Sequence, residues 1–356
     1  MTGHLDIDLT ALAANWRTLA AMNKGETAAV VKADAYGLGA ARVAPVLEAA
    51  GCKTFFTAHL AEAVALRAVL PQARILALNG LVPHAAADFV AHGITPILSS
   101  LKEIMLWRAE ARGLERLLPA FLHVETGLNR LALPQREFAS LREDPTLLEG
   151  ITISTVMTHL ITAETPEDDR NPRQRAALLD MAAHFPGARR SLCNSPGMFL
   201  GPDYHFDLTR PGAALYGLNT SPAQPAPMRP VVRLSAPVLQ IREIQQGEGV
   251  GYGGSWVAQR PSRIATVGVG YGDGLLRALS NNGNAYFDDC PVPLVGRVSM
   301  DLATFDVTDI PANPGDMLVL LDSRHGADDL AREGGTIGYE ILTSLGRRYQ
   351  RRYIGA

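Results

Sequence analysis

The chain has 356 residues, of which 47% are hydrophobic and 19% are charged, and its formal net charge at pH 7 is −3. This composition is too apolar for a disordered protein, and the near-neutral charge balance gives no basic surface for nucleic acid. No apolar run approaches the ~20 residues that span a bilayer, and the N-terminus carries Asp6 and Asp8 where a signal peptide needs a basic start. We therefore expect a cytoplasmic protein with no nucleic-acid or membrane partner, divided into a large and a smaller domain.

The first part of the chain alternates short apolar runs with amphipathic stretches. The apolar runs cover residues 28–32, 54–58, 74–78, 94–98, 120–124, 153–157, 190–193 and, more weakly, 206–209. Eight such strands, each followed by a helix such as the one expected over 60–69, predict an α/β fold, a (β/α)8 TIM barrel. An open doubly wound sheet is the alternative, but it usually has fewer strands and often a Gly-rich first turn, and residues 32–37 show no dinucleotide fingerprint.

The pattern changes after the Pro-rich stretch 221–230. Strands are predicted over 231–244, 263–268, 292–298, 302–307 and 317–321, with no long helix until residues 327–348. We therefore predict a barrel domain over residues 1–228, which would bind a cofactor, followed by a smaller, mostly β domain over residues 229–356.

Cysteine and histidine usage argues against disulfides and metal sites. The chain has only Cys52, Cys193 and Cys290, never in C-x-x-C spacing, so no disulfide framework or structural zinc site is indicated. Its nine histidines include no H-x-H or H-E-x-x-H pair. A metal-dependent hydrolase is therefore disfavoured, and no metal is expected.

In a barrel, functional side chains gather at the carboxyl ends of the strands. The residues that the predicted strands bring to that rim are Lys32, Tyr36, Arg130, His159, Ser195, Arg210, Gly212 and Ala213. Lys32 is the only one of the four lysines that follows a buried apolar run. Partial burial and neighbouring cations lower the pKa of an amine, as Schiff-base and general-base lysines require, although a strand-end lysine can also simply extend to water.

Two small-residue turns on this rim suit a phosphate group. Ser195 with Gly197, and Gly212 with Ala213, allow backbone N–H groups to approach phosphate oxygens, although such turns are also common without a ligand. A lysine on the same rim as a phosphate site indicates pyridoxal 5′-phosphate (PLP).

The second part of the chain holds two tyrosines among glycines. Tyr252 lies in Gly249-Val-Gly-Tyr-Gly-Gly and Tyr271 in Gly268-Val-Gly-Tyr-Gly-Asp-Gly, and neither segment fits a nucleotide-binding glycine loop. A projecting tyrosine hydroxyl is one interpretation. An ordinary β-turn with an aromatic ring packed on it is the other.

These motifs, in this order and over essentially the whole chain, resemble those of the alanine racemase family. The matching segments are Ala29-Val-Val-Lys-Ala-Asp-Ala-Tyr-Gly37, Glu125-Thr-Gly-Leu-Asn-Arg130, Met157-Thr-His159, Asn194-Ser195, Arg210-Pro-Gly212, Gly251-Tyr-Gly253, Gly270-Tyr-Gly-Asp-Gly274, Gly296-Arg-Val-Ser-Met-Asp301 and Ile337-Gly-Tyr-Glu340. The resemblance implies an isomerase that interconverts L- and D-alanine with PLP, supplies D-alanine for peptidoglycan, and works as a homodimer with shared active sites.

The resemblance also implies a role for each matched residue. Lys32 would carry the cofactor covalently and serve as the base facing the D-enantiomer, while Tyr252 of the partner subunit would face the L-enantiomer. Arg210 would contact the pyridine nitrogen of the cofactor, with His159 supporting it. Arg130 and the Met300 N–H would bind the substrate carboxylate, and Tyr271 would line the substrate entrance. The residues implied to contact the phosphate are Tyr36, Ser195, Gly212, Ala213 and Tyr339.

One departure from the family and several rival functions stay open. Many members carry a CO2-carboxylated lysine where this chain has His123, so water, an anion or another side chain must orient Arg130. A racemase for serine or another small amino acid is an alternative, as is a non-catalytic PLP-binding or vitamin-homeostasis protein, although the latter lacks a β domain. A decarboxylase of the same fold would need a carboxylate in the place of Arg210.

Overall fold

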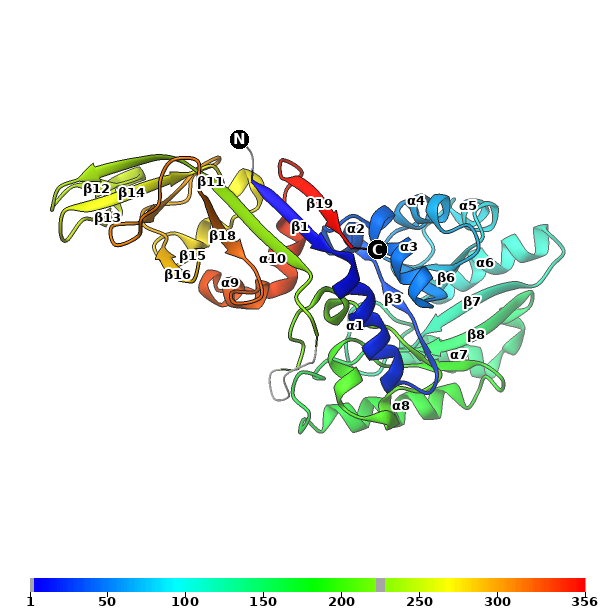
Figure 1. Ribbon diagram of the computed structural model, residues 1–356. Helices are drawn as coiled ribbons and strands as arrows, with labels where there is room; N and C mark the ends of the chain where they lie inside the picture. The colour runs from blue at the N-terminus through cyan, green and yellow to red at the C-terminus, as the bar shows by residue number, and fades with distance from the viewer. Residues whose placement is uncertain (1–2, 222–227, 356) are drawn as a thin grey trace.

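The computed structural model describes residues 3–221 and 228–355 and shows a barrel of parallel strands beside a mostly β lobe (Figure 1). The seven strands of the main barrel sheet are, in spatial order, β3 (Ala29–Val30), β4 (Thr54–Thr57), β5 (Arg74–Ala77), β6 (Ile94–Leu98), β7 (Leu118–His123), β8 (Ile151–Met157) and β9 (Arg189–Ser191). Every neighbouring pair in this sheet is parallel.

An eighth strand closes the barrel. β10 (Leu208–Thr209) pairs in parallel with β2 (Glu26–Thr27), which lies just before β3 in the chain. The Arg210 N–H donates to the Cys193 carbonyl after β9 at 2.9 Å, and the Val30 N–H donates to the Pro211 carbonyl at 3.0 Å. These bonds join the two edges of the main sheet through β10, and the predicted α/β barrel is confirmed.

Helices cover the outside of the barrel. They are α1 (Leu9–Met22), α3 (Ala40–Ala50), α4 (Leu60–Val69), α5 (Ala86–Ala91), α6 (Leu101–Gly113), α7 (Gln135–Glu143) and α8 (Arg170–Ala182), whereas the short α2 (Lys32–Tyr36) lies at the rim. The expectation of a helix after every strand is wrong for the last two. β9 is followed by 3₁₀ turns η2 (Pro196–Phe199) and η3 (Pro202–Tyr204), and β10 by η4 (Ala213–Tyr216), because prolines and glycines interrupt both segments.

The barrel strands are covered by apolar side chains on both faces. Phe55 and Phe56 of β4 and Phe121 of β7 are almost completely buried, and the rings of Phe56 and Phe121 meet edge to face with centroids 6.1 Å apart. Each buried ring of this size stabilises the fold by about 1.5–3 kcal/mol relative to an exposed one. The barrel is therefore a packed support for its rim rather than a channel.

The second lobe is built on a mixed sheet around one long strand. Its strands are β1 (His4–Asp8), β11 (Val232–Ile244), β14 (Ser262–Val267), β15 (Asn284–Phe287), β16 (Cys290–Pro293), β17 (Ala303–Asp306), β18 (Met317–Leu321) and β19 (Gln350–Ile354), with a separate hairpin of β12 (Gly249–Val250) and β13 (Trp256–Val257). β11 pairs with β1, β14 and β18. The first strand of the chain thus lies in the sheet of the second lobe, and the boundary near residue 228 stays a prediction.

Two predicted elements of this lobe are shorter than expected. The strand predicted over 292–298 is β16, which ends at Pro293, and the helical region predicted over 327–348 forms α9 (Ala327–Gly334) and α10 (Gly338–Ser344). α9 ends at Gly335, whose φ of +67° is the left-handed conformation that glycine adopts without strain. The break turns α10 so that it reaches the rim of the barrel.

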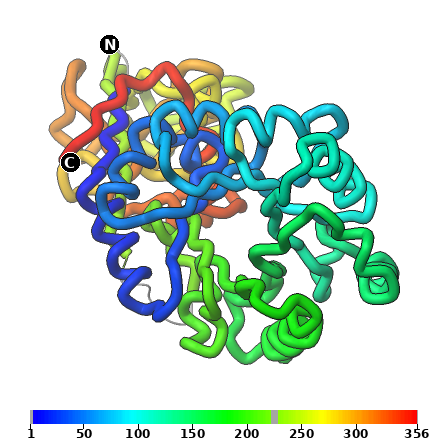
Figure 2. Tube along the Cα trace, turned by 90° about the vertical axis from the view of Figure 1, so that its right-hand side faces the viewer, coloured from blue at the N-terminus to red at the C-terminus, as the bar shows by residue number. Residues whose placement is uncertain are grey.

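The first and last strands of the chain, β1 and β19, lie side by side (Figure 2), and β19 contacts the loop behind Lys32. β1 and β19 pair in parallel from His4 with Gln350 to Asp8 with Ile354. From β19, Arg351 Nη1 donates to the Gly37 carbonyl at 2.6 Å, and the Tyr353 hydroxyl donates to the Leu38 carbonyl at 3.0 Å. The last strand therefore braces the segment that follows the first barrel strand.

Over residues 3–221 and 228–355, no helix has the length and apolarity needed to cross a membrane. The three cysteines are free, and within the same ranges no group of three or more His, Cys, Asp or Glu side chains could hold a metal ion.

Candidate active site

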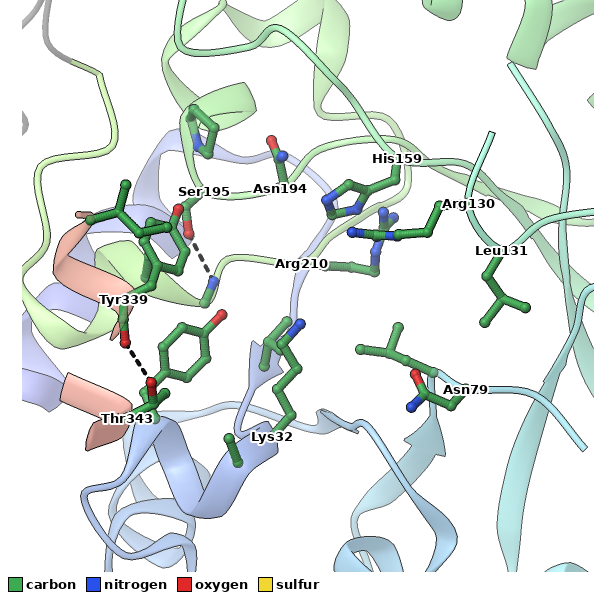
Figure 3. Close-up of a pocket in the computed structure, with 18 of the residues that line it drawn as sticks. Lys32, Asn79, Arg130, Leu131, His159, Asn194, Ser195, Arg210, Tyr339 and Thr343 are labelled. Carbon is green, nitrogen blue, oxygen red and sulfur yellow. Dashed lines mark hydrogen bonds between the residues drawn. The ribbon is translucent and has the colours of Figure 1, made fainter. Parts of the chain in front are cut away.

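A cavity of about 800 Å³ opens at the carboxyl ends of the barrel strands, where the predicted site residues converge (Figure 3). The predicted residues that line it are Lys32, Tyr36, Arg130, His159, Ser195, Arg210, Gly212, Ala213 and Tyr339. All but Tyr339 follow strands of the barrel, and Tyr339 comes from α10 in the second lobe. The cavity is therefore formed by both lobes of one chain.

Lys32 is presented by a left-handed turn. β3 ends at Val30, so Lys32 is not on the strand as expected but begins α2, in which Ala33, Asp34, Ala35 and Tyr36 have φ values of +52° to +56°. Left-handed backbone costs an L-residue roughly 1–2 kcal/mol, and here it runs through four consecutive non-glycine residues. The turn places both Lys32 and Tyr36 on the cavity wall, so the strain occurs where two site residues are positioned.

Basic side chains dominate the electrostatics of the cavity. Burial lowers the pKa of the Lys32 amine, the Arg130 charge lowers it further, and the Glu62 carboxylate opposes both. Burial likewise holds the pKa of His159 well below its usual range, with Arg210 and Arg130 adding to the effect. The cavity thus favours a neutral imidazole and anionic ligands.

Arg210 is a buried cation whose hydrogen-bond partners are neutral. It is only 4% exposed, Nη2 donates to the Thr158 carbonyl at 2.6 Å, and Nη1 donates to the Ser191 hydroxyl. Burial lowers its pKa to about 10, which still leaves the guanidinium protonated at neutral pH. Its fixed position makes it a hydrogen-bond donor rather than an acid for a ligand in the cavity.

Ser195 and Gly212 form a polar cradle that leaves no room for a larger side chain. The Ser195 hydroxyl oxygen accepts the N–H groups of Gly212 at 2.8 Å and Ala214 at 3.2 Å. A Cβ added at Gly212 would collide with the Tyr36 hydroxyl and approach the Val30 Cβ at 3.3 Å. The space between these groups suits the oxygens of a small anion such as phosphate.

Arg130 lacks a fixed partner within the described part of the chain. It lines the cavity, and its guanidinium makes no hydrogen bond or ion pair there with residues 3–221 or 228–355. The nearby His123, which stands where many relatives carry a carboxylated lysine, also lines the cavity and is buried.

His123 makes the stability of the fold depend on pH. Burial, assisted by Arg210 and Arg130, lowers its pKa to about 3, so between pH 3 and ~6.5 the unfolded chain binds a proton that the folded chain does not. Stability therefore falls as pH falls through this window, by about 1 kcal/mol from pH 7.5 to 5.5 for this residue alone. We expect urea unfolding of the protein without added ligand to show that loss, and the His123→Gln variant to show it reduced by that amount. Identical pH dependence in both proteins would contradict a buried neutral imidazole.

Three predicted site residues lie outside the cavity. Tyr252, Tyr271 and Met300 belong to the second lobe and are 71%, 44% and 55% exposed. Tyr252 begins the turn η5 (Tyr252–Gly254) at the tip of the β12–β13 hairpin. The loops of Tyr271 and Met300 are joined, because the Gly272 N–H donates to the Met300 carbonyl at 2.8 Å. None of the three therefore belongs to the cavity lining of its own chain.

Sequence reasoning missed several cavity residues. They are Asn79, Leu131, Ile337, Glu340 and Thr343, besides backbone neighbours of the predicted residues. Thr343 was detectable in principle, because it lies one helical turn after Tyr339 and its hydroxyl donates to the Tyr339 carbonyl at 2.9 Å. Asn79 follows β5. Because no charged residue follows that strand, nothing in the sequence marked this part of the rim as a site.

Family models match both parts of the chain. Residues 7–220 match the alanine racemase N-terminal domain and residues 231–353 the alanine racemase C-terminal domain. The chain belongs to the alanine racemase family. Among curated relatives of this family, the alanine racemase of Acidiphilium cryptum is 55% identical over 98% of this chain and 97% of its own length. A protein of Agrobacterium fabrum named "Alanine racemase, catabolic" is 48% identical over 99% of this chain and 92% of its own length.

Solved structures of the family share the complete fold. The alanine racemase of Bartonella henselae, which contains covalently bound pyridoxal phosphate, aligns with a TM-score of 0.96 at 42% identity, over 99% of this chain and all of its own. The biosynthetic alanine racemase of Pseudomonas aeruginosa aligns with a TM-score of 0.90 at 31% identity, over 99% of both chains. The family resemblance found in the sequence is thereby confirmed.

Proposed function

We propose that this protein racemises alanine with PLP bound in the cavity. The observation that carries the proposal is the meeting of Lys32, whose amine pKa is lowered, with the Ser195–Gly212 cradle and the Arg210 cation in one cavity. The cradle has the donors and the space that a phosphate needs, and Lys32 has the amine that an aldehyde needs. When bound, PLP supplies an electron-withdrawing ring that acidifies the Cα–H bond of an attached amino acid.

The residues assigned to the cofactor divide between its two ends. Tyr36, Ser195, Gly212, Ala213 and Tyr339 would hold the phosphate, and Arg210, supported by His159, would donate to the pyridine nitrogen. Because the Arg210 guanidinium remains protonated at neutral pH, it would leave that nitrogen without a proton of its own. In that position the Arg210 cation would limit how much negative charge the bound ring could take up.

Racemisation requires one base on each face of the substrate Cα, and we assign one of these roles to Lys32, whose amine lines the cavity and has a lowered pKa. The tyrosines of the cavity are poor bases, since burial raises the pKa of Tyr36 and raises that of Tyr339 to about 12. We assign the second base to Tyr252 of a partner copy, because this tyrosine is exposed at a hairpin tip. Lys32 would exchange the proton of D-alanine and Tyr252 that of L-alanine, and the functional unit would be a homodimer.

The substrate carboxylate would bind the unpaired Arg130 and, from the partner copy, the Met300 N–H. Tyr271, whose loop is tied to that of Met300, would line the entrance in the same assembly. A single positive side chain at the carboxylate site suits any small amino acid. Serine therefore remains the alternative substrate.

Circular dichroism of L-alanine incubated with the PLP-loaded protein tests the proposed function. We expect the signal to decay to zero while total alanine, assayed in parallel, is conserved. A persistent signal would contradict alanine racemisation, and the same measurement with L-serine would then decide the alternative. Loss of total alanine would instead indicate transamination or another side reaction.

We propose further that the D-alanine supplies peptidoglycan. One of the relatives above is named biosynthetic and another catabolic, so this role needs its own test. Expression of the protein in a bacterium that requires D-alanine should allow growth without it. Growth that still depends on added D-alanine would count against a biosynthetic role.

The Gly212→Ala variant tests the phosphate cradle. The added methyl group would collide with the Tyr36 hydroxyl and displace one wall of the cradle. We expect PLP affinity, measured by fluorescence titration, to fall by about 10-fold or more. Gly113→Ala is the matched control, since a Cβ at Gly113 meets nothing within 4 Å. Equal PLP affinity in the two variants would place the phosphate elsewhere.

A further inference from the structure

Glu62 connects the turn that carries Lys32 to the neighbouring strand. It is the third residue of α4, and its Oε2 accepts the N–H groups of Ala58 at 2.8 Å and His59 at 3.2 Å, just beyond β4. Its other oxygen, Oε1, accepts the N–H of Ala33 at 2.7 Å. One carboxylate therefore fastens the residue after Lys32 to the end of the next barrel strand.

This contact is made where the backbone is strained. Ala33 is the first left-handed residue of α2, and the turn's own hydrogen bonds begin later, with the Ala35 N–H donating to the Val31 carbonyl at 2.9 Å. The Ala33 N–H thus finds its acceptor outside the turn. Hydrogen bonds from backbone N–H groups to a carboxylate are about twice as strong as those to neutral acceptors. Glu62 consequently helps to hold the conformation that presents the lysine.

The same brace occurs elsewhere in the barrel without a lysine. Glu103 is the third residue of α6, and its Oε2 accepts the N–H of Ser99, just beyond β6, at 2.5 Å. Glu62 and Glu103 therefore have equivalent places in two strand–helix units. If the brace only stabilised the strand–helix connection, loss of Glu62 and loss of Glu103 would have the same effect on Lys32. Only Glu62, however, contacts the Lys32 turn.

Charge gives Glu62 a second effect that Glu103 does not share. The ionisable groups around Lys32 are Arg130 after β7, Arg210 after β10, His123 of β7, His159 after β8, Asp34 and Tyr36 of its own turn, Tyr339 and Glu340 of α10, and Glu62 of α4. Glu62 is the one carboxylate whose charge raises the pKa of the lysine, against the lowering by burial and Arg130. Its removal should leave the amine in a more strongly cationic environment.

We propose that Glu62 is a positioning residue for Lys32, one that holds the start of the left-handed turn and balances the charge of Arg130 at the amine. This inference rests on the proposed function, because it concerns the lysine assigned to the cofactor and to one of the two proton transfers. It predicts that loss of the carboxylate charge changes the titration of Lys32, and that loss of the equivalent brace at Glu103 does not.

The chain is well suited to a direct measurement, because it has only four lysines. Reductive methylation of the full-length protein with ¹³C-formaldehyde, before PLP is added, gives one NMR signal for each lysine, and the Lys32→Arg variant assigns that of Lys32. We expect Glu62→Gln to lower the pKa of Lys32 by about one unit. Glu103→Gln should leave it unchanged, and Glu62→Asp, which keeps the charge, should retain most of the wild-type value.

The PLP-loaded protein supplies a second measurement. In the D-to-L direction, where Lys32 takes the proton, the acidic limb of the kcat profile, which reports groups of the enzyme–substrate complex in which the Lys32 amine is free, should move to lower pH in Glu62→Gln and stay in place in Glu103→Gln. An unchanged Lys32 titration in Glu62→Gln, or an equal shift in Glu103→Gln, would overturn the inference. A wild-type protein that neither binds PLP nor racemises alanine would refute the proposed function instead, while the NMR titration would still decide the role of Glu62.

Discussion

Without its amine, the Lys32→Ala variant should no longer bind PLP covalently, and racemisation of alanine should fall by about 10³-fold or more. Lys32 is the one lysine that lines the cavity, and burial and the Arg130 charge lower the pKa of its amine. Borohydride reduction followed by peptide mass spectrometry measures the attachment. The wild-type protein should carry the cofactor mass on the peptide that contains Lys32.

The exposed Lys24 provides the control for this experiment. Lys24→Ala should retain both the covalent cofactor and the activity, because this residue lies in a polar turn away from the cavity. Cofactor mass on a peptide other than that of Lys32, or racemisation by Lys32→Ala at the wild-type rate, would refute the assignment.

The second large effect concerns Tyr252. Tyr252→Phe removes the hydroxyl proposed to exchange the proton of L-alanine, so we expect a loss of racemisation of about 10²–10⁴-fold with PLP still bound. The phenyl ring remains, so packing at the hairpin tip changes little. Measurement of both the rate and the bound cofactor separates loss of the base from loss of the site.

Mixed assemblies test whether Tyr252 acts on a partner's cavity. When Lys32→Ala and Tyr252→Phe chains are co-expressed, a mixed dimer has one site with an intact Lys32 and an intact Tyr252, and the other site lacks both. Random pairing should therefore restore about a quarter of the wild-type activity, although each variant alone is inactive. No recovery in purified mixed dimers would mean that both groups act within one chain.

The elements that the sequence predicts best are those with strong local periodicity. α4 begins and ends at the predicted residues, because its apolar side chains repeat at helical spacing between two turns. The barrel strands are also close to the predicted runs, since a strand buried on both faces is a short apolar block. The ends of the predicted strands define the rim of the barrel, and the residues predicted at that rim line the cavity.

The features that could not be predicted depend on contacts between distant residues. Alanine disfavours left-handed backbone, so nothing local in residues 33–35 indicates the turn that presents Lys32, and its support comes from Glu62 on another helix. The pairing of β1 with β19 joins residues more than 340 positions apart. Likewise, the exposure of Tyr252 appears only once the hairpin has been placed in the second lobe.

The contact of β19 with the loop behind Lys32 bears on how the protein matures on the ribosome. Residues 37 and 38 leave the ribosome early, yet the Arg351 and Tyr353 side chains that hold their carbonyls are synthesised more than 300 residues later. Closure of the barrel also requires a later segment, β10, to pair with β2. Nascent chains that stop before about residue 350 should therefore contain barrel structure without a finished lysine turn, and capture of the cofactor becomes a late event that follows synthesis of β19.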